Sequence, residues 1–318
     1  MLYETIYIAS RDKNGGIYRY EYSKGNAYKE CSFYPMDSPM YMIKRHNQMH
    51  ILLRAPFDTV DSGYICCDIL SNGELCKYSK IVSTQGEIAC HLTEFNNHIF
   101  CVNYTSGDVT KIGKKTINHN KEELPVSHPH YVGPTPDGKY ICVTDLGQDY
   151  IYIYDDDLNC VNKVKMPHGH GVRHLIFSCD GRYVYTANEL KSTVSVLKYN
   201  DGNMEIIDTK SCLPEDFNGV SYASAIRIYN EEIYVANRGH NSISKMAFDG
   251  QKLEFLDSFS CNGITPRDFI FHENRIICAN QDSDSVTVFE KNDNGAFSFI
   301  QKIEIIEPIC VICGSQED

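Results

Sequence analysis

Residues 128–155, HPHYVGPTPDGKYICVTDLGQDYIYIYD, and residues 171–199, GVRHLIFSCDGRYVYTANELKSTVSVLKY, are two copies of one unit. Each copy has a polar start, a short apolar run, an Asp-Gly turn, an alternating strand, a polar end and a second alternating strand. An Asp-Gly pair between alternating apolar runs is a strong hairpin signal. The unit is therefore a small antiparallel sheet, and its repetition along the chain decides the fold.

The same unit recurs through most of the chain. We call the residue that opens the first strand of a copy its start position, and these residues are Met40, Cys90, His130, Arg173, Ser224 and Arg267. Successive copies are thus about 40 to 50 residues apart, which is the period of a four-stranded propeller blade. No amphipathic helix of useful length is visible by period.

A seventh copy is divided between the two ends of the chain. Residues 4–22 match the second half of the unit, and residues 308–313, PICVIC, match its first strand with Ile309 at the start position. Pairing of these segments in one blade closes the ring and removes two open strand edges. We therefore predict an all-β, seven-bladed β-propeller with about four antiparallel strands per blade, in a single domain over residues 1–318. Two stacked sandwich domains are the alternative, in which the divided copy would be accidental.

Composition narrows the possible partners. The net charge of −12 over 318 residues argues against nucleic acid, whose phosphates require a basic surface. No apolar run approaches the roughly 20 residues that span a bilayer, and MLYETIYIAS at the N-terminus lacks the basic and apolar regions of a signal peptide. We expect a cytoplasmic protein that binds neither nucleic acid nor membrane. An acidic single ring is compatible with a monomer, and the sequence leaves the oligomeric state open.

Two patterns suggest metal binding but are poorly suited to it. Most of the 14 cysteines lie in apolar strand runs, which indicates buried thiols in a reducing compartment. Cys310 and Cys313 have CxxC spacing, but residues three apart on a strand point to opposite faces. His168 and His170 have HxH spacing without the carboxylates expected beside a metal. We predict no metal and no cofactor.

The predicted propeller also locates a candidate site. The first strand of a blade starts, and the second strand ends, on the same face, so start and end positions meet around one mouth of the central channel. The end positions are Arg11, a residue near Arg54, Tyr104, Leu146, Glu189, Arg238 and Gln281. Ionisable residues gather there on consecutive blades, namely His130, Arg173, Glu189, Arg238, Arg267 and Arg11. This cationic cluster with one carboxylate and one imidazole suits a small anionic substrate.

Several of these residues have a simpler interpretation. Arg and Glu side chains in such a channel also form structural ion pairs, and a cluster that is only paired would belong to a non-catalytic binding or scaffold protein. Asn103, Asn188, Asn237 and Asn280 recur at one repeat position, which indicates turn or channel hydrogen bonds. Asp137 and Asp180 each precede a glycine and are predicted to be turn residues.

The motifs HPH…PDGKYICVTDLGQDYIYIYD, RHLIF…DGRYVYTANELKSTVSV, YVANRGHNSIS and TPRDF…ANQDSDSVTVF resemble the lactonase family of seven-bladed propellers. That family includes bacterial propeller-type 6-phosphogluconolactonases and fungal carboxymuconate-lactonizing enzymes. The resemblance covers essentially the whole chain and is strongest over residues 128–290. It implies a metal-free site of one His, two Arg and one Glu, carried by His130, Arg173, Glu189 and Arg238. His128 is the alternative for the histidine, and Arg267 for the second arginine.

We therefore predict a metal-independent lactonase that hydrolyses a sugar lactone, with 6-phosphogluconolactone as the first candidate. His130 or Glu189 would be the general base, and the other would orient it or protonate the leaving hydroxyl. Arg173 would stabilise the oxyanion. Arg238 and Arg267 would hold a phosphate or carboxylate. Further candidate substrate contacts are Arg11, Gln281, His128 and Asn188. A carboxymuconate-type lactonizing cycloisomerase is the alternative enzyme, since the same arginines and histidine serve both reactions.

Overall fold

The computed structural model describes residues 4–22, 27–121 and 123–314. Those residues form seven antiparallel sheets, six with four strands and one with five. The sheets are the blades of a seven-bladed β-propeller, which confirms the predicted fold class. The chain divides into two compact units, Met1–His91 with Asn262–Asp318 and Leu92–Cys261. The expectation of one domain over residues 1–318 stays a prediction.

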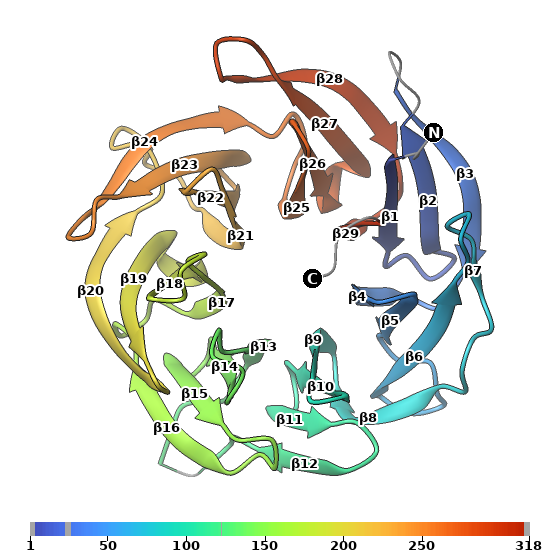
Figure 1. Cartoon of the computed structure of the whole chain (residues 1–318), viewed down its shortest axis with the longest axis horizontal. Helices are drawn as coiled ribbons and strands as arrows, with labels where there is room; N and C mark the ends of the chain where they lie inside the picture. The colour runs from blue at the N-terminus through green and yellow to red at the C-terminus, as the bar shows by residue number, and fades with distance from the viewer. Residues whose placement is uncertain (1–3, 23–26, 122, 315–318) are drawn as a thin grey trace. The chain divides into compact units, whose positions relative to one another are not determined.

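The first unit contains three blades (Figure 1). Blade 1 consists of β29 (Pro308–Cys313), β1 (Glu4–Ser10), β2 (Gly16–Tyr22) and β3 (Tyr28–Pro35). Blade 2 consists of β4 (Pro39–Arg45), β5 (Gln48–Leu53), β6 (Asp61–Ile69) and β7 (Leu75–Cys76), with β8 (Val82–Glu87) paired to β6. Blade 7 consists of β25 (Pro266–His272), β26 (Arg275–Asn280), β27 (Ser285–Lys291) and β28 (Phe297–Glu304), with the 3₁₀ helix η2 (Gln281–Ser283) after β26.

The second unit contains blades 4 to 6 and most of blade 3. Blade 3 consists of β9 (Ala89–Phe95), β10 (His98–Asn103), β11 (Asp108–Lys111) and β12 (Lys115–Asn118). Blade 4 consists of β13 (Pro129–Pro134), β14 (Ile141–Asp145), β15 (Tyr150–Tyr154) and β16 (Cys160–Lys165). Blade 5 consists of β17 (Val172–Phe177), β18 (Tyr183–Asn188), β19 (Thr193–Asn200) and β20 (Asn203–Ser211), with η1 (Glu189–Lys191) after β18. Blade 6 consists of β21 (Tyr222–Tyr229), β22 (Glu232–Arg238), β23 (Ser242–Phe248) and β24 (Leu253–Ser260).

Blade 1 is assembled from both ends of the chain, as the divided copy predicts. Strand β29 pairs antiparallel with β1, from Ile6 opposite Cys313 to Ser10 opposite Pro308, and Figure 1 shows the two strands side by side. Strand β1 pairs in turn with β2. The C-terminal strand therefore supplies the first strand of the blade and covers an edge of β1 that would otherwise be open.

The two cysteines of β29 lie on opposite faces of that strand. Cys310 packs in a core cluster with Met42 and Met49, whereas Cys313 packs in a different cluster with Ile277. The prediction that CxxC spacing on a strand separates the two thiols is confirmed, and one metal ion cannot bind both of them.

The position of a strand within its blade determines how many of its side chains are buried. All five residues of β14, an inner strand, are buried, including the polar residues Thr144 and Asp145. The outermost strand β20 alternates between exposed and partly buried residues. Burial thus separates the inner strands, both of whose faces are covered, from the outermost strands, which have exposed residues.

The Asp-Gly turns of the repeat have the predicted structural role. The Asp137 carboxylate accepts a hydrogen bond from the Thr135 hydroxyl at 2.6 Å. Gly138 and Gly181, which follow Asp137 and Asp180, have φ angles of 68° and 70°. This left-handed conformation carries no steric penalty for glycine.

Two features are absent from the sequence prediction. Blade 2 has the fifth strand β8, and the end positions of blades 5 and 7 open three-residue 3₁₀ helices.

Within residues 4–22, 27–121 and 123–314, no helix is long and apolar enough to cross a membrane.

Candidate active site

The start positions of the repeat lie at irregularities of strand pairing. In blade 4, Pro129 pairs with Asp145 and Tyr131 with Thr144, so His130 is the extra residue of a β-bulge. Register shifts also fall at the start positions Ile309, Met40, Arg173, Ser224 and Arg267. A bulge bends the strand and changes the direction of its side chain. The strand pairing therefore confirms that these six positions, chosen from sequence spacing, are equivalent.

The end positions follow from the same pairing. Asn188, the last residue of β18, pairs with Val172, the residue before a start position. The next residue, Glu189, opens η1. In blade 2 the equivalent pairing ends at Leu53, so Arg54 is the end position that the sequence located only approximately. The repeat thus brings Glu189 to the same end of blade 5 as the start position Arg173.

Three of the predicted site residues form one ion-pair cluster in the second unit. Glu189 Oε2 lies 3.0 Å from Arg173 Nε and 2.7 Å from Arg238 Nη2. The exposed fraction of the side chain is 3% for Arg173, 15% for Arg238 and 16% for Glu189. Two guanidinium groups and one carboxylate leave the cluster with a net charge of +1. A cluster this deeply placed can bind an anion with little screening by solvent.

The two arginines are also anchored to the backbone of β21. Arg173 Nη1 donates a hydrogen bond to the Ser224 carbonyl oxygen at 2.9 Å, and Arg238 Nη2 donates one to the Ala223 carbonyl oxygen at 3.4 Å. The Arg238 guanidinium carbon lies 5.9 Å from the ring centroid of Tyr222, which is 41% exposed. Blades 5 and 6 therefore hold the guanidinium groups jointly.

His130 lies in a group of aromatic rings. It is buried, with its ring centroid 5.6 Å from that of Tyr104 and 5.2 Å from that of His174. His128 instead stacks on Tyr104 at 4.5 Å, and its Nδ1 donates to the Tyr104 carbonyl oxygen at 3.0 Å. Of the two histidines in HPH, His130 is therefore the one whose ring leads, through His174, toward Arg173.

His174 is a member of this group that the repeat analysis did not select. Its Nε2 lies 3.1 Å from Arg173 Nη1, and its ring also lies near Tyr131, at 5.9 Å between centroids. Strict alternation would place His174 and Arg173 on opposite faces of β17. The bulge at Arg173 changes that relation. The sequence signal for His174 is its place in the RHL motif, directly after Arg173.

A fully buried carboxylate holds the segment that carries His128 and His130. Asp145 accepts hydrogen bonds from His119 Nδ1 at 2.9 Å, from the Ser127 hydroxyl at 2.6 Å and from the His128 backbone N–H at 2.9 Å. Burial raises the pKa of Asp145, but the bonds from His119 and Ser127 outweigh it and lower the pKa below its ordinary value. Asp145 therefore acts as a structural carboxylate.

The recurring asparagines are strand-pairing residues. Asn188 is fully buried, and its Nδ2 donates to the hydroxyls of Thr193 at 3.1 Å and Ser195 at 2.9 Å. Asn103, Asn237 and Asn280 donate to serine or threonine hydroxyls in the same manner. Among the candidate substrate contacts, Asn188 therefore forms hydrogen bonds within blade 5, and its part in substrate binding stays a prediction.

Three predicted site residues belong to the first unit. Arg11 pairs with Glu307, Nη2 to Oε1 at 3.3 Å. Arg267 is the second residue of β25 and is partly exposed. Gln281 is buried, opens η2 and donates from Nε2 to Asp282 Oδ1 at 2.9 Å. Their part in substrate binding stays a prediction.

Among the described contacts, the histidines of the HxH spacing form no side-chain hydrogen bond or ion pair with Glu189, although the His170 carbonyl oxygen accepts a backbone hydrogen bond from Leu190 at 2.9 Å. The side chain of His168 is 94% exposed and lies 3.7 Å from Asp149. His170 Nδ1 lies 3.0 Å from the Thr193 hydroxyl, and burial lowers the pKa of His170. In the part of the chain that the structure describes, no group of three or more His, Cys, Asp or Glu side chains is arranged to hold a metal ion.

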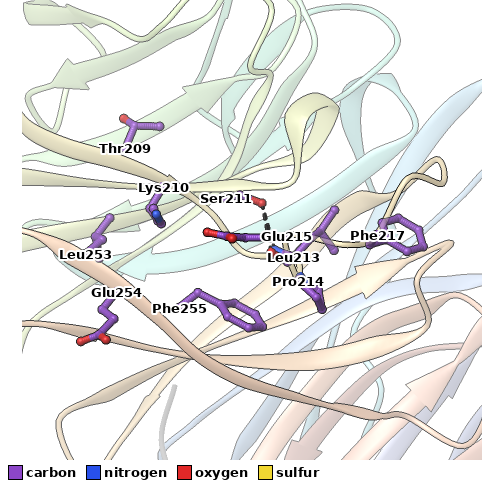
Figure 2. A pocket seen from close by; sticks show the side chains of 10 residues that line it. All are labelled: Thr209, Lys210, Ser211, Leu213, Pro214, Glu215, Phe217, Leu253, Glu254 and Phe255. Carbon is purple, nitrogen blue, oxygen red and sulfur yellow. Dashed lines mark hydrogen bonds between the residues drawn. The ribbon is translucent and has the colours of Figure 1, made fainter.

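A groove of about 850 Å³ lies elsewhere in the second unit, on the outer strands of blades 5 and 6 (Figure 2). It is lined by β20, by the loop after it and by β24, with Lys210, Glu215 and Phe217 among the lining residues. None of the predicted site residues lines it. The groove is therefore a surface feature distinct from the ion-pair cluster.

Known proteins are similar to this chain over nearly its whole length. The family model described as "Lactonase, 7-bladed beta-propeller" matches residues 5–313. An uncharacterized protein of Staphylococcus aureus (strain USA300) is 31% identical over 342 residues, covering 96% of this chain and 98% of that protein. The solved structure of the periplasmic gluconolactonase of Pseudomonas aeruginosa has a TM-score of 0.89 and 22% identity, covering 98% and 99% of the two chains. A Bacteroides fragilis protein provisionally named a 6-phosphogluconolactonase has a TM-score of 0.85 and 22% identity, covering 98% of both chains.

Proposed function

Because the chain belongs to the lactonase family of seven-bladed β-propellers, we propose that it hydrolyses a sugar lactone, with 6-phosphogluconolactone as the first candidate substrate. The observation that carries the proposal is the carboxylate oxygen shared by two guanidinium groups, Arg173 at 3.0 Å and Arg238 at 2.7 Å. A guanidinium group held in place can stabilise the negative charge that forms on the oxygen of an ester carbonyl during hydrolysis.

His130 and the residues of the cluster have separate roles in the reaction. His130 takes a proton from water, and the resulting hydroxide adds to the lactone carbonyl carbon. Arg173 stabilises the negative charge that forms on the carbonyl oxygen. The ring C–O bond then breaks, and His130 returns the proton to the leaving oxygen, which gives the hydroxy acid. Glu189 holds both arginines in place throughout.

Histidine rather than Glu189 is assigned as the base because of what each side chain contacts. The Glu189 carboxylate is already engaged by two cations. An imidazole exchanges its proton near neutral pH and so serves as base and acid in successive steps. Arg238 is left to bind an oxygen of the substrate.

The charges of the cluster favour a reaction in which Arg173 polarises the carbonyl. A divalent cation placed beside Glu189 would meet two guanidinium groups within 3.0 Å of the same oxygen. Cation sites of that kind are built from carboxylate, carbonyl and water oxygens. We therefore expect activity to persist in excess chelator.

A substrate panel tests the proposal. Ring opening of 6-phosphogluconolactone, gluconolactone and simple lactones is followed at constant pH against the spontaneous rate, with and without chelator, and a carboxymuconate is offered in parallel. The proposal predicts hydrolysis of at least one sugar lactone above the spontaneous rate. Turnover of the carboxymuconate alone would instead assign the cycloisomerase reaction, and buffer rates throughout would leave the cluster as a structural ion pair.

A further inference from the structure

We propose that His174 is a positioning residue of this site, which holds the Arg173 guanidinium by accepting its hydrogen bond as a neutral imidazole. The role in positioning stands on the structure alone, whereas its kinetic consequence rests on the proposed lactone hydrolysis.

The guanidinium of Arg173 is fixed from three directions. Its Nη1 donates to His174 Nε2 at 3.1 Å and to the Ser224 carbonyl oxygen at 2.9 Å, and its Nε lies 3.0 Å from Glu189 Oε2. Arg173 and His174 are both at least 94% buried, with exposed fractions of 3% and 6%. Ser224 contributes its backbone carbonyl to this arrangement, whereas His174 and Glu189 contribute side chains.

The chemistry of the contact determines the protonation state of His174. A guanidinium nitrogen can only donate a hydrogen bond. His174 Nε2 must therefore accept, which requires its lone pair and leaves the single ring proton on Nδ1. A doubly protonated ring would turn an N–H toward the guanidinium and would place a second positive charge against it. Arg173 and His174 thus stay together only while the imidazole is neutral.

The ring of His174 also contacts the proposed base. His130 and His174 pack edge to face at 5.2 Å, and Tyr131 lies on the other side at 5.9 Å. Among the described contacts of His174, the titratable groups that face it are Arg173 from its own strand, and His130 and Tyr131 from β13. A neutral ring at this position connects the histidine and the arginine of the site without adding charge to it.

Two substitutions separate the acceptor from the ring. His174→Gln retains an acceptor in place of Nε2, whereas His174→Phe retains an aromatic ring against His130 and removes the acceptor. Loss of one hydrogen bond to a charged group predicts about a ten- to hundredfold lower kcat for His174→Phe. Because Arg173 acts on the transition state, KM changes little, and His174→Gln keeps kcat within about fivefold of the wild type. His168→Gln, at a site that is 94% exposed, is the matched control.

A spectroscopic measurement tests the same inference without any substrate. In ¹⁵N NMR of the whole protein, we expect His174 to show the neutral Nδ1–H tautomer from pH 6 to 8. An Nε2–H tautomer, or protonation of His174 within this range, would overturn the proposal even if the variants fail to fold. Equal kcat in His174→Phe and His174→Gln would overturn it as well. If the wild type hydrolyses no lactone while the NMR result holds, the proposed function fails and the positioning role stands.

Discussion

Glu189→Gln is the substitution that tests the ion-pair cluster most fully. It removes the negative charge between Arg173 and Arg238 but keeps the shape of the side chain. Glu189 Oε2 lies 3.0 Å and 2.7 Å from the two guanidinium groups, and the side chains are 3% to 16% exposed. The cluster thus lies between exposed pairs, which contribute about 0 to 1 kcal/mol, and buried pairs, whose disruption costs about 3 to 5 kcal/mol.

We therefore expect Glu189→Gln to lower the free energy of unfolding by about 2 to 3 kcal/mol. With an unfolding entropy of about 2 cal/mol/K per residue, this corresponds to a fall in Tm of about 3 to 5 °C for a chain of 318 residues. The same substitution should also lower kcat by about a hundred- to a thousandfold, because Arg173 loses the partner that orients it. Thermal unfolding and initial rates measure the two effects.

Glu232→Gln is the matched control, since Glu232 pairs with Lys245 at 2.6 Å in the same unit with both side chains 31% exposed. It should change stability by less than about 1 kcal/mol. In a double-mutant cycle, Arg238→Gln should partly relieve the repulsion in Glu189→Gln and give a coupling energy of about 1 kcal/mol or more. If Glu189→Gln behaves like Glu232→Gln in both stability and rate, the ion-pair argument is refuted.

Three further predictions concern stability. Removal of residues 308–318 deletes β29, whose last five side chains are 0 to 4% exposed. The lost burial is worth about 8 kcal/mol, which is comparable to the whole stability of a domain, about 5 to 15 kcal/mol. The truncated chain should therefore not fold, and a cooperative unfolding transition measured by circular dichroism would contradict this. Asp145→Ala leaves His119 and its neighbours without their acceptor and should lower the free energy of unfolding by about 3 kcal/mol. Asp201→Asn, at an exposed pair with a positive φ angle that asparagine tolerates, should change it little; equal effects in denaturant titrations would contradict this role. Burial lowers the pKa of His50 from 6.5 to about 4, so between these pH values the unfolded chain binds more protons than the folded chain. The free energy of unfolding should therefore fall by on the order of 2 kcal/mol as the pH falls from 6.5 to 4. A His50→Asn variant that keeps the whole of that pH dependence would exclude His50 as its source.

The fold could be predicted because its unit is local and repeated. An Asp-Gly turn between two alternating runs marks each hairpin by itself, and Asp137 and Asp180 have the turn role that this pattern indicates. The closure of blade 1 was predictable because PICVIC has the pattern of a first strand and residues 4–22 match the second half of the same unit. Long-range pairing could thus be inferred only where a repeat had already fixed the partner.

The missing features lack such a local signal. Strand β8, VSTQGE, has no apolar alternation, and only its pairing with β6 makes it a strand. The helix η1 is three residues long, which is too short for a helical period to be visible. His174 was missed because alternation along a strand predicts that the side chains of neighbouring residues point to opposite faces. A bulge at Arg173 changes that relation, and no residue type in the sequence indicates the bulge.

The site could be predicted where the repeat is broken by a functional residue type. His130, Arg173 and Glu189 stand at positions that carry Met, Cys or Leu in other copies. The structure brings Arg173, Glu189 and Arg238 into one cluster and connects His130 to it through His174. Asn188 stood at an equally suitable place in the sequence, and only the structure shows its hydrogen bonds to Thr193 and Ser195.

The central claim is that Arg173 stabilises the oxyanion of a lactone under hydrolysis. Its most direct test is the ring-opening rate of the best sugar lactone with the wild type, with Arg173→Ala and with Arg182→Ala, whose arginine is 72% exposed and pairs only with the turn residue Asp180 among the described ion pairs. The account predicts a loss in kcat of about a hundred- to a thousandfold for Arg173→Ala and an unchanged rate for Arg182→Ala. Equal rates in the two variants, both still folded and both above the spontaneous reaction, would contradict it.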